Sequence, residues 1–193
     1  MTERFSHLVW EGRFQPVHRG HLAHVGELLR RTERLTVVVV ANETSADARH
    51  RSPVPGFSRT VDGHHAGERN PWPLWLRHRM VRATVEAVFP ERAGDVQVLA
   101  GHRLDLDWPL YQQLLPPERV FAVPSRDDFE DAKADAWTAL GERVLRVDID
   151  HLPKLSGTLV RELMAADSPL DEVLHPVTLE LLRAAAEAGE VPA

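Results

Sequence analysis

The chain has 193 residues, of which 43% are hydrophobic and 27% are charged, and its formal net charge at pH 7 is −6. These values are typical of one folded α/β-sized domain, so we expect a single domain over residues 1–193 and exclude wholesale disorder. The sequence contains no cysteine, which excludes disulfides, thiolate metal ligands and a thiol nucleophile. The acidic balance argues against nucleic acid as a partner, although a local field at a cleft can still attract a small anion.

The sequence gives no sign of a signal peptide or of a membrane-spanning segment. The first residues, MTERFSHLVW, lack the apolar core of a signal peptide, and the longest apolar run, at 35–41, is too short to cross a membrane. We therefore expect a cytoplasmic protein with no membrane partner.

Apolar runs that favour strands alternate along the chain with periodic segments that favour helices. In chain order, the pattern predicts a strand at 5–10, a helix at 20–31, a strand at 35–41, a helix at 74–89, a strand at 96–100, a short helix at 108–115, a strand at 120–123, a helix at 128–140, a strand at 144–149 and helices from 156 onward. This alternation predicts an α/β fold with a parallel sheet of about five strands and a helical C-terminal part at 156–193. Ligands of such sheets bind beyond the carboxyl ends of the strands, where the strand order reverses.

One segment, 43–69, has no usable hydrophobic period. It is rich in proline, glycine and polar residues, so we expect a long loop insertion. His64 and His65 follow Asp62 in this segment, but adjacent histidines in a polar loop supply too few ligands at the wrong spacing for a metal site. The sequence therefore predicts no metal ligands from the protein here.

The segment from Gly12 to His21, GRFQPVHRGH, follows the first predicted strand and opens the first predicted helix. Gly12 and Gly20 lack side chains and let a ligand approach the backbone, while the helix N-terminus offers free N–H groups to phosphate. His18 and His21 are three residues apart and share a face, so both can donate to a phosphate oxygen, and an imidazolium would add charge in the transition state. The alternative is a pair of structural histidines at a helix start.

A second segment near the C-terminus, LSGTLVR from Leu155 to Arg161, also opens a predicted helix. Ser156 is a candidate N-cap, and Thr158 and Arg161 share a face one turn apart. A hydroxyl and a guanidinium at a helix N-terminus are suited to the outgoing pyrophosphate end of a nucleoside triphosphate. Alone, the segment is equally compatible with an ordinary capped helix.

Together the two segments resemble the GRFQPxHxGH and ISxTxIR motifs of the nicotinamide-mononucleotide adenylyltransferases, members of the HxGH nucleotidyltransferase superfamily. The resemblance implies a Rossmann-like, doubly wound fold and in-line attack of an acceptor phosphate on the α-phosphorus of a triphosphate. It implies catalytic roles for His18, His21 and Arg161. The positions that it implies for nucleotide binding are Gly12, Arg13, Phe14, Gln15, Gly20, Ser156 and Thr158. Magnesium is expected to travel on the triphosphate and to keep most of its waters.

The acceptor side resembles that family less closely. Asn70, with Pro71 and Trp72, resembles its Asn-Pro-aromatic step, and Trp108 follows Asp107 where the family places an aromatic residue that stacks on the nicotinamide ring. We expect Asn70, Asp107 and Trp108 to bind the acceptor, with plain packing as the alternative for Trp108. Trp72 and Trp75 are expected to be core or packing residues rather than ligand contacts. The insertion at 43–69 replaces a short acceptor-side loop, and Pro-Ser-Arg at 124–126 replaces the family's Gly-Asn pair.

Three functions remain compatible with the sequence. The first is transfer of AMP from ATP to nicotinamide mononucleotide, which gives NAD and pyrophosphate. The second is adenylyl or cytidylyl transfer, from ATP or CTP, to another small phosphate or phosphonate acceptor. The third is a non-catalytic nucleotide sensor, which the intact histidine and arginine set disfavours. The oligomeric state, including a homo-oligomer, stays open.

Overall fold

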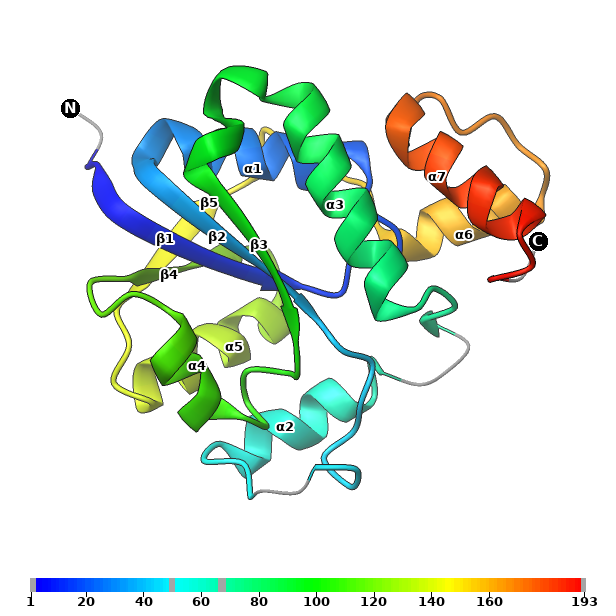
Figure 1. Ribbon diagram of the computed structural model, residues 1–193. Helices are drawn as coiled ribbons and strands as arrows, with labels where there is room; N and C mark the ends of the chain where they lie inside the picture. The colour runs from blue at the N-terminus through cyan, green and yellow to red at the C-terminus, as the bar shows by residue number, and fades with distance from the viewer. Residues whose placement is uncertain (1–2, 49–50, 66–68, 192–193) are drawn as a thin grey trace.

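The computed structural model describes residues 3–48, 51–65 and 69–191. In this part of the chain, five strands form one parallel sheet with the order β3-β2-β1-β4-β5 (Figure 1). The strands are β1 (Phe5–Gly12), β2 (Thr32–Val40), β3 (Val96–Gly101), β4 (Val120–Ser125) and β5 (Val144–Asp148). The expected α/β fold with a doubly wound parallel sheet is confirmed.

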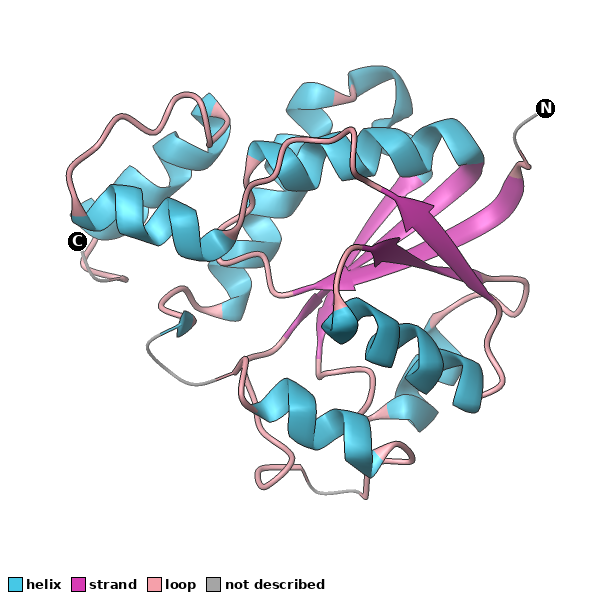
Figure 2. Cartoon of the chain, turned by 180° about the vertical axis from the view of Figure 1, so that it is seen from behind, coloured by secondary structure: helices cyan, strands magenta, loops and turns pink. Residues whose placement is uncertain are grey.

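Helices cover both faces of the sheet. They are α1 (Arg19–Arg31), α2 (Pro55–Asp62), α3 (Leu74–Val88), α4 (Trp108–Leu114), α5 (Asp128–Ala139), α6 (Gly157–Ala165) and α7 (Pro176–Glu187), with a 3-10 turn, η2 (Pro90–Asp95). Figures 1 and 2 show α1 and α3 on one face, α2, α4 and α5 on the other, and α7 beside α3. Across the described ranges, every helix is too short or too polar to traverse a lipid bilayer.

The second strand explains why the sheet is covered on both sides. Residues 37–40 are four consecutive valines, all buried. Because side chains alternate across a strand, Val37 and Val39 join the core under α1 and α3, whereas Val38 and Val40 join the core under α4 and α5. β-branched residues pack well on such a surface. Trp10 pairs with Val37 in register, so β1 and β2 end at the same edge.

The strand order reverses at the central strand. From β1 the chain builds β2 and β3 on one side, and β4 and β5 then lie on the other side of β1. The connections that leave β1 and β4 at their carboxyl ends run to opposite faces, α1 above and α5 below (Figure 1). A doubly wound sheet opens a ligand crevice at such a point.

The insertion is more structured than the sequence indicates. Residues 55–62 form α2, which begins at Pro55, and Phe57 and Val61 are buried in the core with Trp137. The Phe57 ring lies 5.8 Å from the Trp137 ring. The expectation of a loop is therefore wrong for 55–62: Phe57, Ser58 and Val61 share a buried face, but the helix is only eight residues long and lies among prolines and glycines that favour a loop. Residues 49–50 and 66–68 of the insertion lie outside the described residues.

A buried arginine attaches α2 to the loop after β3. Arg103 donates to both carboxylate oxygens of Asp105 at 3.1 and 2.6 Å, to Asp62 at 2.6 Å and to the Ser58 carbonyl at 3.0 Å. Ser58 also donates to Asp105 at 2.5 Å. A buried guanidinium is tolerated when its donors are matched by carboxylates and carbonyls in this way. The α2 helix is therefore fixed to the sheet by charge as well as by apolar packing.

The indole of Trp108 lies in the core. Its residue is 5% exposed, its ring stacks at 6.1 Å on Trp137, and the Arg119 guanidinium lies 5.6 Å from its centre. The expected stacking of Trp108 on an acceptor is therefore corrected: Trp108, the first residue of α4, packs into the core with Phe121 and Trp137. Trp72 is buried as well, whereas Trp75 is 46% exposed and does not have the packing role expected for it.

Truncation of Trp108 tests this placement. We expect Trp108→Ala to lower the free energy of unfolding by about 3–5 kcal/mol, because it leaves a cavity among packed aromatic rings. Trp75→Ala is the matched control, and its exposed ring should change the stability by less than about 0.5 kcal/mol. Urea unfolding followed by circular dichroism measures both. Equal, small effects would place Trp108 at the surface.

Candidate active site

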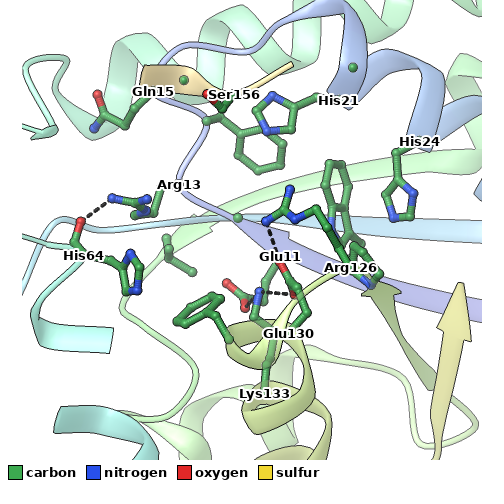
Figure 3. A pocket seen from close by; sticks show the side chains of 18 of the residues that line it. Glu11, Arg13, Gln15, His21, His24, His64, Arg126, Glu130, Lys133 and Ser156 are labelled. Atoms are coloured by element: carbon green, nitrogen blue, oxygen red, sulfur yellow. Dashed lines mark hydrogen bonds and ion pairs between the residues drawn. The ribbon is translucent and has the colours of Figure 1, made fainter. Parts of the chain in front are cut away.

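A cavity of about 300 Å³ lies at the carboxyl ends of β1 and β4. Both sequence motifs line it, although they are far apart in the chain. The predicted residues at its wall are Gly12, Arg13, Phe14, Gln15, His18, Gly20, His21, Ser156, Thr158 and Arg161. In Figure 3, His21, Gln15 and Ser156 lie along one side of the cavity and Arg13 and His64 at one end. The crevice is therefore where the reversal of strand order predicts it.

His18 and His21 cap α1 reciprocally. The backbone N–H of His21 donates to Nδ1 of His18, and the backbone N–H of His18 donates to Nδ1 of His21, both at 3.3 Å. The two rings stack with their centres 3.6 Å apart. Because each Nδ1 accepts, each neutral ring carries its proton on Nε2. The cap thus leaves each histidine with a donor for a ligand.

Burial keeps both rings uncharged at neutral pH. Burial, with a further contribution from Arg126, lowers the pKa of His18 to about 4. Burial and the neighbouring His18 hold the pKa of His21 well below its usual value. The site without ligand therefore presents two neutral imidazole donors, rather than the imidazolium considered from the sequence, and its positive charge comes from guanidinium groups.

The turn between β1 and α1 is held from inside. Phe14 has a left-handed backbone (φ 51°), and its buried ring packs edge-on against Trp10 at 5.1 Å and against His21 at 5.0 Å. The side-chain amide of Gln15 exchanges two hydrogen bonds of 3.2 Å with the Trp72 backbone. These side chains shape the turn, because packing and hydrogen bonds hold a conformation that a bulky residue rarely adopts.

The second motif is attached directly to the first. Arg161 donates to the Gln15 carbonyl at 2.8 Å and to the Thr158 hydroxyl at 3.1 Å. A side chain at Gly157 would place its Cβ 2.5 Å from the Gln15 carbonyl oxygen, so only glycine permits this approach. Ser156 caps α6 by accepting from the Leu159 N–H at 3.1 Å. The N-terminus of α6 is therefore fixed beside the N-terminus of α1, and both present N–H groups to the crevice.

Arginines give the crevice its positive field. Burial and the nearby Arg161 lower the pKa of Arg13, and burial and Arg69 lower the pKa of Arg161. Arg13 and Arg161 both line the cavity, so an anion bound there would offset the repulsion that Arg13 feels from Arg161. Arg13 donates to the His64 carbonyl and, at 3.2 Å, to Asn70 Oδ1.

The three residues predicted for acceptor binding do not meet in the cavity. The cavity wall includes none of Asn70, Asp107 and Trp108. Asn70 supports Arg13 and donates to the His64 carbonyl at 3.1 Å, and Asp107 precedes the first turn of α4. The cavity as described is therefore lined without these three side chains, and contact of Asn70 or Asp107 with an acceptor stays a prediction.

Sequence reasoning missed part of the cavity wall. Lys133 contacts Glu11 at 3.0 Å and Glu130 at 3.1 Å, and these carboxylates raise its pKa despite its burial (Figure 3). Arg126, directly after β4, pairs with Glu130 at 3.3 Å. The position of Arg126 at a strand end was a usable signal. The sequence contained no comparable signal for Lys133, because helical periodicity indicates which face of a helix is buried but not which residues that face contacts.

Three further histidines, His24, His64 and His65, line the same cavity. Because His24 and His65, like His18, are buried in the folded protein, their protonation makes the folding stability depend on pH. Burial lowers the pKa of His24 to about 4 and that of His65 to about 3. The unfolded chain takes up protons on these side chains below about pH 6.5 while the folded chain does not, so folding stability falls as the pH drops from about 6.5 towards 4.

We expect the free energy of unfolding to decline over that window, by up to about 1.4 kcal/mol per pH unit for each buried histidine. His24→Asn should flatten the decline, whereas His151→Asn, at an exposed position, should leave its slope unchanged. Denaturant unfolding at several pH values between 4.5 and 7.5 measures the slopes. Identical slopes in all three proteins would contradict a neutral, buried His24.

Comparison with known proteins agrees with this geometry. The model of the cytidylyltransferase-like family matches residues 9–163, which include both motifs. The phosphonoformate cytidylyltransferase of Streptomyces viridochromogenes is 30% identical over 178 residues, which cover 91% of this chain and 89% of the relative.

Solved structures of adenylyltransferases share the fold. A bifunctional NMN adenylyltransferase/ADP ribose pyrophosphatase from Francisella tularensis superposes with a TM-score of 0.65 at 14% identity; 94% of this chain is covered, and this chain spans only 50% of that protein. The Plasmodium falciparum nicotinic acid mononucleotide adenylyltransferase, complexed with NaAD, superposes with a TM-score of 0.58 at 13% identity, covering 94% of this chain and 96% of that one. The resemblance in the motifs thus extends to the whole sheet. The chain belongs to the cytidylyltransferase-like family of nucleotidyltransferases.

Proposed function

We propose that this protein moves CMP from CTP onto a small phosphonate or phosphate acceptor and releases pyrophosphate. The observation that carries the proposal is the 30% identity with a phosphonoformate cytidylyltransferase over 91% of the chain. The likeness to adenylyltransferases, at 13 and 14% identity, is a likeness of fold, and one fold serves many substrates.

The acceptor side supports a small substrate in place of nicotinamide mononucleotide. The aromatic side chain expected to stack on a pyridine ring, Trp108, is buried under α4. The cavity instead ends at Arg13, His64 and His65, which are groups that bind anions and offer hydrogen bonds. A compact anion needs charge and donors more than it needs a stacking surface.

The chemistry requires positioning more than proton transfer. An anionic acceptor oxygen attacks the α-phosphorus, a new P–O bond forms, and the bond to the bridging oxygen breaks with its electron pair left on pyrophosphate. We assign the Nε2–H groups of His18 and His21 to the oxygens of the α-phosphate, where charge develops. Arg161 and the N-terminus of α6 are assigned to the departing phosphates. Magnesium would be carried by the triphosphate and would offset part of its charge, and we assign it no ligand from the protein.

A substrate screen tests the proposed function. Purified protein with magnesium is offered CTP or ATP together with phosphonoformate, methylphosphonate or nicotinamide mononucleotide, and pyrophosphate release is followed by a coupled assay. We expect the fastest release from CTP with phosphonoformate, because that pair matches the named relative. Formation of a dinucleotide from ATP and nicotinamide mononucleotide, without release from CTP, would establish the NAD-forming alternative. CTP binding without release from any acceptor would favour a sensor.

Replacement of the capping histidines separates their two roles. Asparagine can keep an acceptor near the position of Nδ1 but has no donor at the position of Nε2, so His18→Asn and His21→Asn retain the cap and lose the ligand contact. We expect each to reduce kcat by about a hundredfold or more, with a small change in the KM for CTP. His18→Ala should, in addition, destabilise the protein by about 0.5–2 kcal/mol through loss of the cap. Near-normal kcat in a folded asparagine variant contradicts the assignment.

A further inference from the structure

The inserted α2 reaches the active-site cavity at its C-terminal end. Phe57 and Val61 anchor the helix in the core, and both also line the cavity. Arg103 holds Asp62, the last residue of α2, at 2.6 Å. The chain then runs through His64 and His65, which lie at the cavity wall. The described part of the insertion therefore forms part of the cavity wall.

The backbone of this segment is joined to the first catalytic motif. The His64 carbonyl accepts from the Arg13 guanidinium and from the Asn70 amide, the latter at 3.1 Å. Figure 3 shows the contact between Arg13 and His64 at the end of the cavity. Because Arg13 belongs to the β1–α1 turn, the position of residue 65 is set relative to the reacting phosphates.

The His65 side chain is buried and incompletely bonded. It is 4% exposed, lines the cavity, and has no hydrogen-bond partner at Nδ1. In His18 and His21, by contrast, Nδ1 accepts from a backbone N–H. An unpaired polar atom in the interior costs free energy, which a ligand that bonds to it would recover.

The surroundings of His65 are positive. Burial, followed by the charges of Arg103, Arg13 and Arg77, lowers its pKa to about 3, so the ring is a neutral donor. Arg103 is balanced by Asp62 and Asp105. Arg77, which is buried, donates to the carbonyls of Trp72, Arg13 and Val40, so in its described hydrogen bonds it meets no carboxylate. An anion beside His65 would gain from this excess charge.

We infer that His65 and Arg13 form a subsite for a second anionic group on the acceptor, a carboxylate adjacent to the phosphonate or phosphate that reacts. This inference rests on the proposed function and specifies its substrate class: small acceptors with a carboxylate close to phosphorus. The Arg13 guanidinium supplies the charge, and the neutral His65 ring donates the directional hydrogen bond. His65 thereby selects among acceptors without contacting the triphosphate.

Binding measurements on a pair of probes test the subsite. Phosphonoformate carries the carboxylate and methylphosphonate does not, and their Kd values are measured by calorimetry for the wild type, His65→Leu and His65→Gln. We expect His65→Leu to weaken phosphonoformate by about tenfold to a hundredfold, the loss typical of a hydrogen bond to a charged group. Methylphosphonate should bind the wild type and His65→Leu with the same Kd. His65→Gln, which retains a donor, should lose less, and it provides the test if the leucine variant fails to fold.

Arg59→Ala is the matched control, because Arg59 is an exposed residue of α2, the helix that precedes His65, and it should bind phosphonoformate like the wild type. Equal weakening of both probes by His65→Leu, or no weakening, overturns the inference, as does a wild type that binds neither probe. Turnover with CTP is measured in parallel. A wild type that binds phosphonoformate through His65 but releases no pyrophosphate refutes the proposed function and leaves the subsite standing.

Discussion

The reversal of strand order at β1 is the constraint on which the site depends. Because β2 and β4 flank the central strand on opposite sides, the chain leaves β1 and β4 towards opposite faces of the sheet and cannot close the gap between them. The GRFQP turn, the N-terminus of α1 and the N-terminus of α6 all meet in that gap. The Arg161 contact with the Gln15 carbonyl then joins the two motifs across it.

Charge in the crevice is divided between two kinds of group. The capping bonds and burial make His18 and His21 neutral donors of fixed orientation, while Arg13 and Arg161 supply positive charge. This division suits a reaction in which every participant is an anion. In the proposed reaction, neutral donors would approach the α-phosphate without charge repulsion between the stacked rings, while the guanidiniums would attract the anionic substrates.

The two comparisons describe different parts of the molecule. What this chain shares with the adenylyltransferases is the fold. The described part of the insertion, with α2 and His65, forms one wall of the cavity, which the proposed function assigns to the acceptor. In the proposed reaction, the attack on the α-phosphorus is the same for each acceptor. A different acceptor would therefore require changes only in the wall of the cavity that contacts it.

Local pattern in the sequence determined the strands, most helices and both phosphate motifs, because each depends on residues close together in the chain. The valine run of β2, the Ser156 cap and the spacing of His18 and His21 belong to this class. Contacts between distant residues were decided by the tertiary structure alone. Trp108 packs against Trp137 in the core, the Gln15 amide bonds to the Trp72 backbone, and α2 is held by Arg103 and Trp137. His65 carried no signal in the sequence for the same reason: its neighbours Arg13, Arg77 and Arg103 reach it only through the fold.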